Sequence, residues 1–184
     1  PRDMGSDVVQ AYRDLPQLTS HLHLPVQSGS SAVLRKMKRF YTRERYLELV
    51  DELMDARPDL SLSTDIIVGF PGETDEDFEQ TMSLLEVVRF DSSFSFKYSP
   101  RPGTPALRLE KYAVEPAVAS ERLTRFQTRQ KSIQIENNRR LEDAVMDVLV
   151  EGRSKWDADV MCGRTSSFKM VNFPGNADLV GQTV

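Results

Sequence analysis

Cysteine is almost absent from this chain, because Cys162 is the only one among 184 residues. A single thiol excludes an internal disulfide framework, and it excludes a zinc or iron–sulfur site built from several cysteines of this chain. Histidine is nearly as scarce, since His21 and His23 are the only two. With no third histidine and no nearby cysteine, we predict no metal site and expect both histidines to be structural or to line a substrate site.

The chain also lacks a long apolar run and an excess of basic residues. No segment looks long and apolar enough to cross a bilayer, and the first ten residues, PRDMGSDVVQ, have neither the basic start nor the apolar centre of a signal peptide. The net charge of −4 argues against binding nucleic acid by overall charge. We therefore expect a cytoplasmic protein with no membrane partner, in which any contact with RNA is local.

What the chain does contain is an α/β pattern. Hydrophobic residues make up 39% of it, which is enough for a folded core. Strands and helices alternate up to about residue 141, which predicts a parallel sheet covered by helices. A long helix that opens near Pro116 should link this part to a second one, with the boundary near Asp143. Short strands then predict a small, unfinished β-barrel, at 144–150, 159–162, 169–173 and 179–184.

The strand expected over 60–70 is the most informative element. Apolar residues alternate with serine and aspartate along it, so one face should meet helices while the other holds something polar. Pro71 and Gly72 predict a turn after this strand. Thr74 and Asp77 have the spacing of a capping box at the start of the next helix.

Two further strands, expected over 21–27 and 93–99, repeat this alternation. Three neighbouring strands would then each present one polar face. Polar side chains that point into a barrel covered by helices are costly to bury unless they satisfy one another or a ligand. We therefore predict a ligand site at the carboxyl ends of these strands.

Three segments carry a family resemblance: HLHLPVQSGS at 21–30, TDIIVGFPGETDEDF at 64–78 and FDSSFSFKYSPRPGTPA at 90–106. Together they resemble methylthiotransferases of the radical S-adenosylmethionine (SAM) superfamily, over nearly the whole chain. The sequence FKYSPRPGTPA, followed by VLVEG, GRT and VNFPG, is most similar to the MiaB-type branch, which modifies isopentenyladenosine in tRNA. Sister branches act on a ribosomal protein or on threonylcarbamoyladenosine, and they typically differ in this sequence.

The resemblance implies an enzyme with an N-terminal cluster domain, a radical SAM barrel with a CxxxCxxC loop, and a C-terminal TRAM domain that binds tRNA. It implies that residues 1–142 are the second half of the TIM-like barrel and that 143–184 are an incomplete, OB-like TRAM barrel. Both sets of cluster cysteines are missing here. We interpret the chain as a fragment with no catalytic residue of its own, inactive alone. A naturally truncated RNA-binding or scaffold relic is the alternative.

The activity implied for the whole enzyme is addition of a methylthio group to carbon two of isopentenyladenosine next to the anticodon. The implied cofactors are SAM and two [4Fe-4S] clusters, whose ligands are absent from this chain. The implied partner is the anticodon stem-loop of tRNA, and the parent enzyme is expected to be monomeric. What remains for this chain is to hold the reacting groups close together and to exclude water.

The resemblance also assigns SAM-binding residues to the three strand ends. Residues 65–73 resemble the GxIxGxxxE element that backs the SAM adenine, with Asp65 in place of its first glycine. Two interpretations of Asp65 stay open, because a carboxylate paired with Lys97 or a histidine would explain it without a ligand. The predicted SAM-binding residues are Gln27, Ser28, Asp65, Ile67, Gly69, Glu73, Tyr98 and Arg101.

Some of these positions have structural alternatives. Glu73 fits a first-turn charge on the helix dipole as well as it fits a ligand contact, and the acidic run 73–79 should be a solvated face. Gly69 is expected to let the backbone approach the ligand, whereas Gly29 and Gly103 are expected to serve turns.

Substrate and RNA contacts are predicted in both parts of the chain. Beyond residue 143, four basic residues face five acidic ones, so no general basic patch is expected there. The aromatic residues of this part would be assigned to the core without the resemblance, and their RNA role depends on it. The predicted substrate- and RNA-binding residues are His23, Lys97, Arg153, Lys155, Trp156, Arg164, Phe168 and Lys169.

Overall fold

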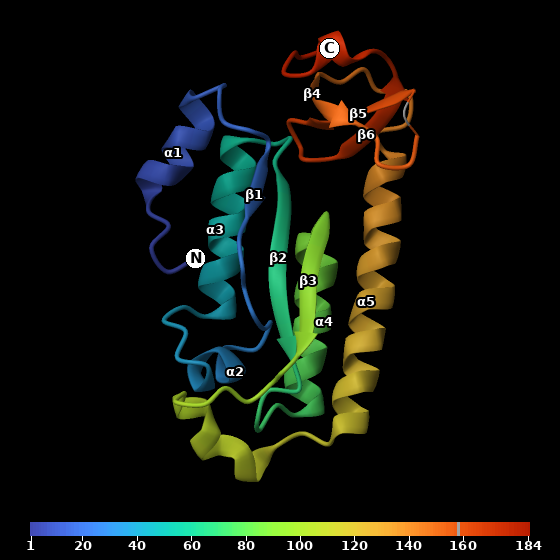
Figure 1. Cartoon of the computed structure of the whole chain (residues 1–184). Coiled ribbons are helices and arrows are strands. Elements are labelled where there is room, and N and C mark those ends of the chain that lie inside the picture. The colour runs from blue at the N-terminus through green and yellow to red at the C-terminus, as the bar shows by residue number, and fades with distance from the viewer. Residues whose placement is uncertain (158) are drawn as a thin grey trace.

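The computed structural model describes residues 1–157 and 159–184. Its first sheet is parallel, with β1 (His21–His23), β2 (Ser61–Val68) and β3 (Ser92–Lys97) in the order β1-β2-β3. The parallel sheet predicted from the alternation of strands and helices is thus confirmed. In Figure 1 the carboxyl ends of these strands point toward the bottom of the view.

The first strand is shorter than the expected 21–27. Pro25 has no N–H to give to a neighbouring strand, and Gln27 has a positive φ of 72°, which breaks the extended conformation. Gln27 still pairs with the next strand, because its N–H donates to the Asp65 carbonyl at 2.8 Å and its carbonyl accepts from the Ile67 N–H at 2.9 Å. The polar end of the expected strand therefore stays in the sheet as an isolated bridge.

Helices cover one face of this sheet and leave the other open, as Figure 1 shows. Buried apolar residues of the helices and of β2 form the core between them, including Tyr46, Leu53, Ile66, Leu85 and Phe90. The α-helices are α1 (Ser6–Asp14), α2 (Ser31–Lys36), α3 (Arg43–Ala56), α4 (Asp75–Val88) and α5 (Pro116–Arg139), with 3-10 helices η1 (Pro105–Tyr112) and η2 (Ala177–Leu179).

Two sequence signals mark where α4 and α5 begin. Thr74 and Asp77 form the predicted capping box of α4, because the Thr74 hydroxyl accepts from the Asp77 N–H while the Asp77 carboxylate accepts from the Thr74 N–H. The long helix α5 begins at Pro116 as expected, and it buries Phe126 and Ile133 against the core. It runs beside β3 and links the two sheets (Figure 1).

The second sheet is antiparallel, with β4 (Val148–Arg153), β5 (Val160–Thr165) and β6 (Met170–Pro174) in that order. Only a bridge forms where a strand over 179–184 was expected: Val148 and Val184 exchange backbone hydrogen bonds, and Leu149 pairs with Thr183. The sheet is therefore not closed. It lies beyond the amino ends of the parallel strands, at the far end of α5 (Figure 1).

Candidate cofactor and RNA site

A cavity of about 620 Å³ lies at the carboxyl ends of the parallel strands. It is lined by Gln27 after β1, by Ile67 of β2, and by the end of β3 with the segment that follows it. Four of the eight predicted SAM-binding residues line it, together with the predicted substrate residue Lys97: Gln27, Ile67, Tyr98 and Arg101. A site at the strand ends was the expectation from the polar faces.

Gln27 reaches this cavity through its unusual backbone. Its φ of 72° turns the chain after β1 while both of its backbone groups stay bonded to β2. A left-handed conformation costs a residue other than glycine about 1 kcal/mol or more. The two bonds to β2 hold the strained residue in place at the edge of the site.

Asp65 does not line the cavity, and its carboxylate pairs with a histidine. His23 Nε2 lies 3.3 Å from Asp65 Oδ1, and His23 Nδ1 lies 2.9 Å from the Ser63 hydroxyl. Both His23 and Asp65 stay about one-third exposed on the open face of the sheet. Of the two interpretations of Asp65, the structure therefore shows the internal pairing with a histidine. An Asp–His pair at this position could still donate to or accept from a bound substrate.

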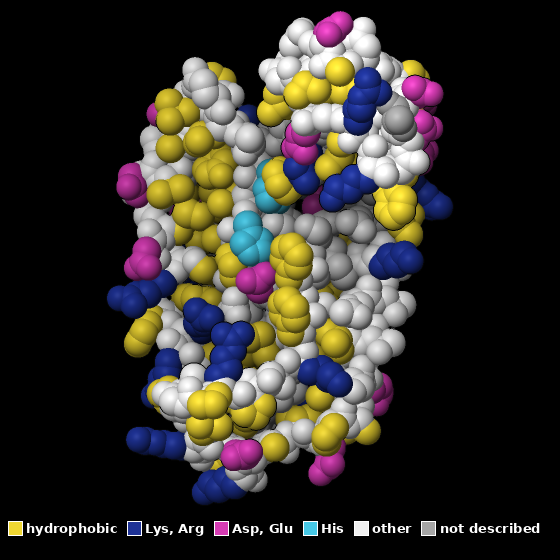
Figure 2. Space-filling view, viewed as in Figure 1, with side chains coloured by type: hydrophobic (Ala, Val, Ile, Leu, Met, Phe, Trp, Pro, Cys, Tyr) yellow, Lys and Arg dark blue, Asp and Glu magenta, His cyan; other side chains and the backbone are white. Residues whose placement is uncertain are grey.

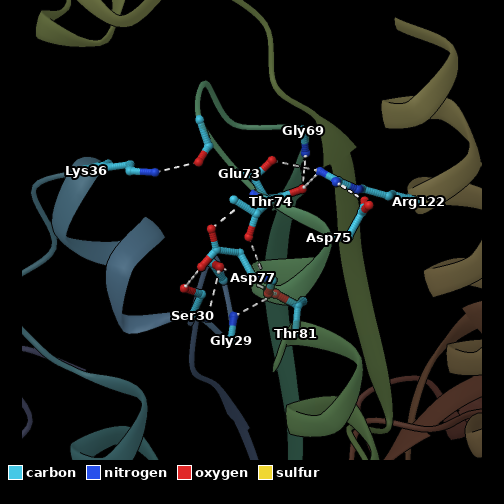
Figure 3. A network of polar contacts seen from close by, with 12 residues as sticks. Gly29, Ser30, Lys36, Gly69, Glu73, Thr74, Asp75, Asp77, Thr81 and Arg122 are labelled. Carbon is cyan, nitrogen blue, oxygen red and sulfur yellow. Dashed lines mark hydrogen bonds and ion pairs between the residues drawn. The ribbon is translucent and has the colours of Figure 1, made fainter. Parts of the chain in front are cut away.

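The loop after β2 is held by a buried ion pair, shown in Figure 3. Glu73 Oε1 accepts from the Gly69 N–H at 2.9 Å and pairs with Arg122 Nη1 of α5 at 2.7 Å, while Arg122 Nη2 reaches Asp75 at 2.6 Å. The Glu73 side chain is only 1% exposed. Burial raises the pKa of Glu73, although the Gly69 N–H and Arg122 oppose this. A carboxylate engaged in this way is not free for a ligand, so we correct Glu73 to a structural residue.

Gly69 is likewise needed for packing. Its φ is +70°, and a Cβ there would come within 2.7 Å of the Ala119 Cβ of α5. The close approach that requires glycine is therefore to a helix of this chain, which corrects the expected approach to a ligand.

Ser28 also differs from the prediction, because it is fully buried. Its hydroxyl lies 3.4 Å from the Thr81 hydroxyl of α4 and accepts from the Ser30 N–H at 3.2 Å. The neighbouring Gly29 packs equally tightly, since a Cβ there would meet the Gln80 carbonyl at 2.5 Å. The turn that contains these residues thus packs on α4 (Figure 3), and we correct both the ligand role of Ser28 and the simple turn role of Gly29.

The acidic run 73–79 is only partly the solvated face that we expected. Asp77 is buried, and it accepts from the hydroxyl of Ser30 and from the N–H of Thr74. Burial would raise the pKa of Asp77, but these hydrogen bonds outweigh burial and lower it. Glu73 can be buried because Arg122 of α5 pairs with its carboxylate. The two residues lie far apart in the sequence, so no local sequence signal predicts this pair.

The third strand presents the opposite face from the one predicted. Register places Phe94 beside Asp65 and Phe96 beside Ile67, so the two aromatic rings lie on the open face, where both are more than half exposed. The polar residues face α5 instead: Ser95 accepts from Gln127 at 3.1 Å, and Lys97 donates to Ser120 at 3.1 Å. The expectation of three polar inner faces holds for β1 and β2 and is wrong for β3.

The predicted RNA residues of the second sheet fall into two groups. Phe168 and Lys169 contact the parallel part, because Phe168 stacks on His21 at 4.8 Å and Lys169 pairs with Asp91 at 2.9 Å. Arg164 lies over Phe168 at 4.6 Å and pairs with Glu151 at 2.6 Å. Lys155 and Trp156 are exposed, with Trp156 at 95%. Arg153 is also exposed and takes part in interactions of its own.

Comparison with known families agrees with the order of these two parts. The Radical SAM superfamily matches residues 2–85, which include β1, β2 and most of α4. The TRAM domain matches residues 139–184, which include the whole antiparallel sheet. Along the chain, the segment similar to the radical SAM superfamily is thus followed by the segment similar to the TRAM domain. The expected fold, a parallel radical SAM sheet followed by an unclosed TRAM sheet, is confirmed.

Individual relatives are similar over the full length of this chain. Proteins named tRNA-2-methylthio-N(6)-dimethylallyladenosine synthase are 45% identical in Clostridium tetani, 48% in Methylococcus capsulatus and 50% in Xanthomonas campestris pv. campestris (strain B100), each over 184 residues. The match covers 100% of this chain and 38 to 40% of each relative. The chain thus spans less than half the length of these relatives, and its radical SAM and TRAM segments both lie inside the matched region.

The described residues offer no metal site of their own. Among residues 1–157 and 159–184, no three His, Cys, Asp or Glu side chains gather as metal ligands. Cys162 lies in β5, with its Sγ 3.6 Å from the Arg153 carbonyl. These residues do not fit an iron–sulfur cluster, which needs several thiolates. In the same part of the chain, no helix combines the length and the apolar character needed to span a membrane.

Proposed function

We propose that the whole protein is a tRNA methylthiotransferase, which adds a methylthio group to carbon two of isopentenyladenosine beside the anticodon. SAM, activated by iron–sulfur chemistry, would supply the reactive group and the methyl group. We propose two [4Fe-4S] clusters with ligands from residues outside this chain, a monomeric enzyme and a cytoplasmic location. We also propose that the radical SAM part comprises residues 1–142 and the TRAM part 143–184.

The observation that carries this proposal is the cavity at the carboxyl ends of the strands, because Gln27 after β1 and Ile67 of β2 on its wall lie in the segment that matches the radical SAM superfamily. Its volume of about 620 Å³ is in the range of sites for cofactor-sized ligands. Gln27 and Tyr98 offer an amide and a ring for the nucleoside, and Arg101 offers a guanidinium for the methionine carboxylate. These residues would orient SAM, while the open face with His23 and Asp65 would meet the substrate base.

The names of the relatives favour this substrate over the alternatives. Each relative above is named as a synthase of 2-methylthio-N(6)-dimethylallyladenosine in tRNA. A ribosomal-protein or threonylcarbamoyladenosine substrate, and a non-catalytic RNA-binding relic, have no such support.

The test uses the full-length protein with its clusters reconstituted under anaerobic conditions. We expect it to convert isopentenyladenosine to the methylthio form in tRNA that carries the isopentenyl group but lacks the methylthio group, as read by mass spectrometry of the digested nucleosides. Arg101→Ala should raise the SAM concentration needed for half-maximal rate, while Arg13→Ala on α1 should leave it unchanged. Absence of product with tRNA, together with product on a ribosomal protein, would contradict the proposal.

A further inference from the structure

A short segment between α2 and α3 separates two hollows of the surface. One is the cavity of about 620 Å³ described above, and the other, of about 570 Å³, lies beside it. Lys38 and Arg39 line both hollows, and Phe40 lines the second. We call Lys38, Arg39 and Phe40 the basic ridge. It was absent from the predicted site residues, although the sequence KMKRF already shows its charge.

The basic ridge carries positive charge that the described part of the chain does not neutralise. Lys38 and Arg39 are exposed, and neither forms an ion pair with a described residue. On α5 the situation is different, because Arg125 and Arg129 pair with carboxylates of α4. The net charge of the chain is −4, so the basic ridge is a local surface of the opposite sign.

The walls of the two hollows extend this charge. Every charged residue that lines the larger cavity is basic: Lys36, Lys38, Arg39, Lys97 and Arg101. The smaller hollow has one carboxylate, Asp3, which pairs with Arg2 at 3.4 Å. Figure 2 shows basic side chains gathered below the two histidines on this face. The surface is therefore suited to an anion that extends through both hollows.

The backbone of the basic ridge is fixed at both ends. Lys38 has a φ of 59°, and its N–H donates to the Arg35 carbonyl at 3.1 Å, while the Arg39 N–H donates to Leu34 at 2.9 Å. Beyond Phe40, the Tyr41 hydroxyl donates to the Val26 carbonyl at 3.1 Å. The ridge is thus held against the end of the first strand, which lowers the ordering cost of binding.

Phe40 adds an exposed ring to the charge. It is 74% exposed, and the Arg2 guanidinium lies 5.0 Å from its ring centroid. A phenylalanine this exposed contributes little to the core. Basic side chains next to an exposed aromatic ring are the combination that single-stranded nucleic acids bind, through phosphates and through base stacking.

We propose that the basic ridge binds the single-stranded loop of the substrate tRNA, with Lys38 and Arg39 on phosphates and Phe40 stacked on an unpaired base. A small anion would occupy one hollow, whereas an RNA strand can lie in the smaller hollow and cross the ridge to the entrance of the larger cavity. This proposal rests on the proposed function, because it places the substrate at the entrance of the same cavity. It adds residues that neither family match assigns.

The experiment measures binding of a fluorescent anticodon stem-loop RNA to the full-length protein at several salt concentrations. Lys38→Ala/Arg39→Ala should weaken binding and reduce the slope of log K against log salt by roughly 1.4 to 1.8, for two phosphate contacts. Phe40→Ala should weaken binding by roughly 5- to 160-fold with an unchanged slope, and Phe40→Tyr should restore it. Arg13→Ala/Arg45→Ala, which removes two charges from α1 and α3, is the matched control.

SAM affinity of the same variants separates the two anionic ligands. Because Lys38 and Arg39 also line the cavity proposed for SAM, the RNA proposal expects the double variant to lose more RNA affinity than SAM affinity. It expects unchanged SAM binding in Phe40→Ala, in Phe40→Tyr and in the control variant. It is overturned if the double variant on the ridge keeps the wild-type affinity and salt slope, or if it loses SAM binding while RNA binding stays intact. Failure of the wild-type protein to bind the stem-loop would instead contradict the proposed function. Far-ultraviolet circular dichroism checks that every variant is folded.

Discussion

At the scale of single residues, two arginines on one face of α5 show how far burial changes the worth of an ion pair. Arg122 is 7% exposed and faces Glu73, which is 1% exposed, whereas Arg125 and its partner Glu79 are both about half exposed. Both arginines also lie near the Phe78 ring, at 5.6 and 5.5 Å. The two sites thus differ mainly in how much water reaches the charges.

We predict that Arg122→Ala destabilises the fold by about 3–5 kcal/mol, because it leaves the Glu73 carboxylate buried without its cation. Arg125→Ala should cost at most about 1 kcal/mol, because water screens its pair with Glu79. Urea unfolding of both variants beside the wild type measures this difference. Equal losses would show that the buried pair has no special role in holding the loop after β2.

The same carboxylate gives a pH dependence with a defined sign. Burial raises the pKa of Glu73 in the folded state, so the folded state favours the protonated form. The resulting stabilisation is complete below the unfolded-state value of about 4.3 and is lost as the pH rises through the folded-state pKa. The cost of Arg122→Ala should therefore be smaller near pH 4 than at pH 7. A cost that grows toward pH 4 would contradict this assignment.

At the scale of elements, the sequence was most informative where local chemistry decides the structure. The capping box of Thr74 and Asp77 and the start of α5 at Pro116 follow from residues a few positions apart, and both are as predicted. The face of β3 could not be predicted in this way. Its serines and its phenylalanines alternate equally well on either face, and contacts with Gln127 and Ser120 of α5 decide between them.

The candidate site shows the same limit. The common position of Gln27, Tyr98 and Arg101 at one cavity was predictable because they follow strands, and strand ends meet at one edge of a parallel sheet. Ser28 and Glu73 also follow strands, but their partners come from α4 and α5. Periodicity within one element carries no information about such distant partners.

Glycine positions at this scale allow a matched comparison. Gly69 and Gly103 have positive φ values of 70° and 80°, but only Gly69 has a neighbour where a Cβ would lie. Gly103→Ala should cost about 1–2 kcal/mol for the left-handed backbone alone. Gly69→Ala should cost about 1–3 kcal/mol more, because the new methyl group meets Ala119.

Thermal or urea unfolding of the two variants tests this difference. Adding Ala119→Gly to Gly69→Ala should recover part of the loss, although glycine in a helix costs about 1 kcal/mol by itself. The packing explanation fails if the two single variants lose the same stability and the double variant shows no coupling.

At the scale of the whole molecule, two side chains of the TRAM part, Phe168 and Lys169, contact the amino ends of the parallel strands. Lys169 pairs with Asp91, which also accepts from Asn137 of α5 at 3.0 Å and from the Ser61 hydroxyl. Burial opposes ionisation of Asp91, but the hydrogen bonds and the Lys169 charge outweigh it and lower the pKa. The ion pair thus joins β6, α5 and the start of the parallel sheet around one carboxylate.

We predict that Lys169→Met loosens the contact between the two sheets. Hydrogen exchange of the 140–147 segment and of β6 should become faster, because the pair is partly buried and its loss leaves Asp91 with only neutral donors. Lys155→Met, on the exposed side of the TRAM sheet, should leave exchange unchanged. Identical exchange in both variants would mean that α5 alone fixes the arrangement.

His21 reports the same contact through its protonation. Its ring stacks on Phe168 at 4.8 Å, and burial lowers the pKa of His21, as do the charges of His23 and Lys169, while Asp91 raises it. The neutral ring favours the folded state, so this stabilisation is present above the unfolded-state value of about 6.5 and is lost as the pH falls through the folded-state pKa. The contact between the sheets should therefore weaken in mild acid.

We predict that Phe168→Ala raises the pKa of His21 toward its ordinary value, because removing the stacked ring lets water reach the imidazole. Titration of the His21 ring protons by nuclear magnetic resonance measures the shift, and Trp156→Ala, at an exposed position of the same sheet, is the control. An unchanged His21 pKa in Phe168→Ala would mean that the parallel sheet alone buries this histidine. A raised pKa would show that Phe168 covers His21 in solution, so that the TRAM part is held against the amino ends of the parallel strands, opposite the cavity at their carboxyl ends.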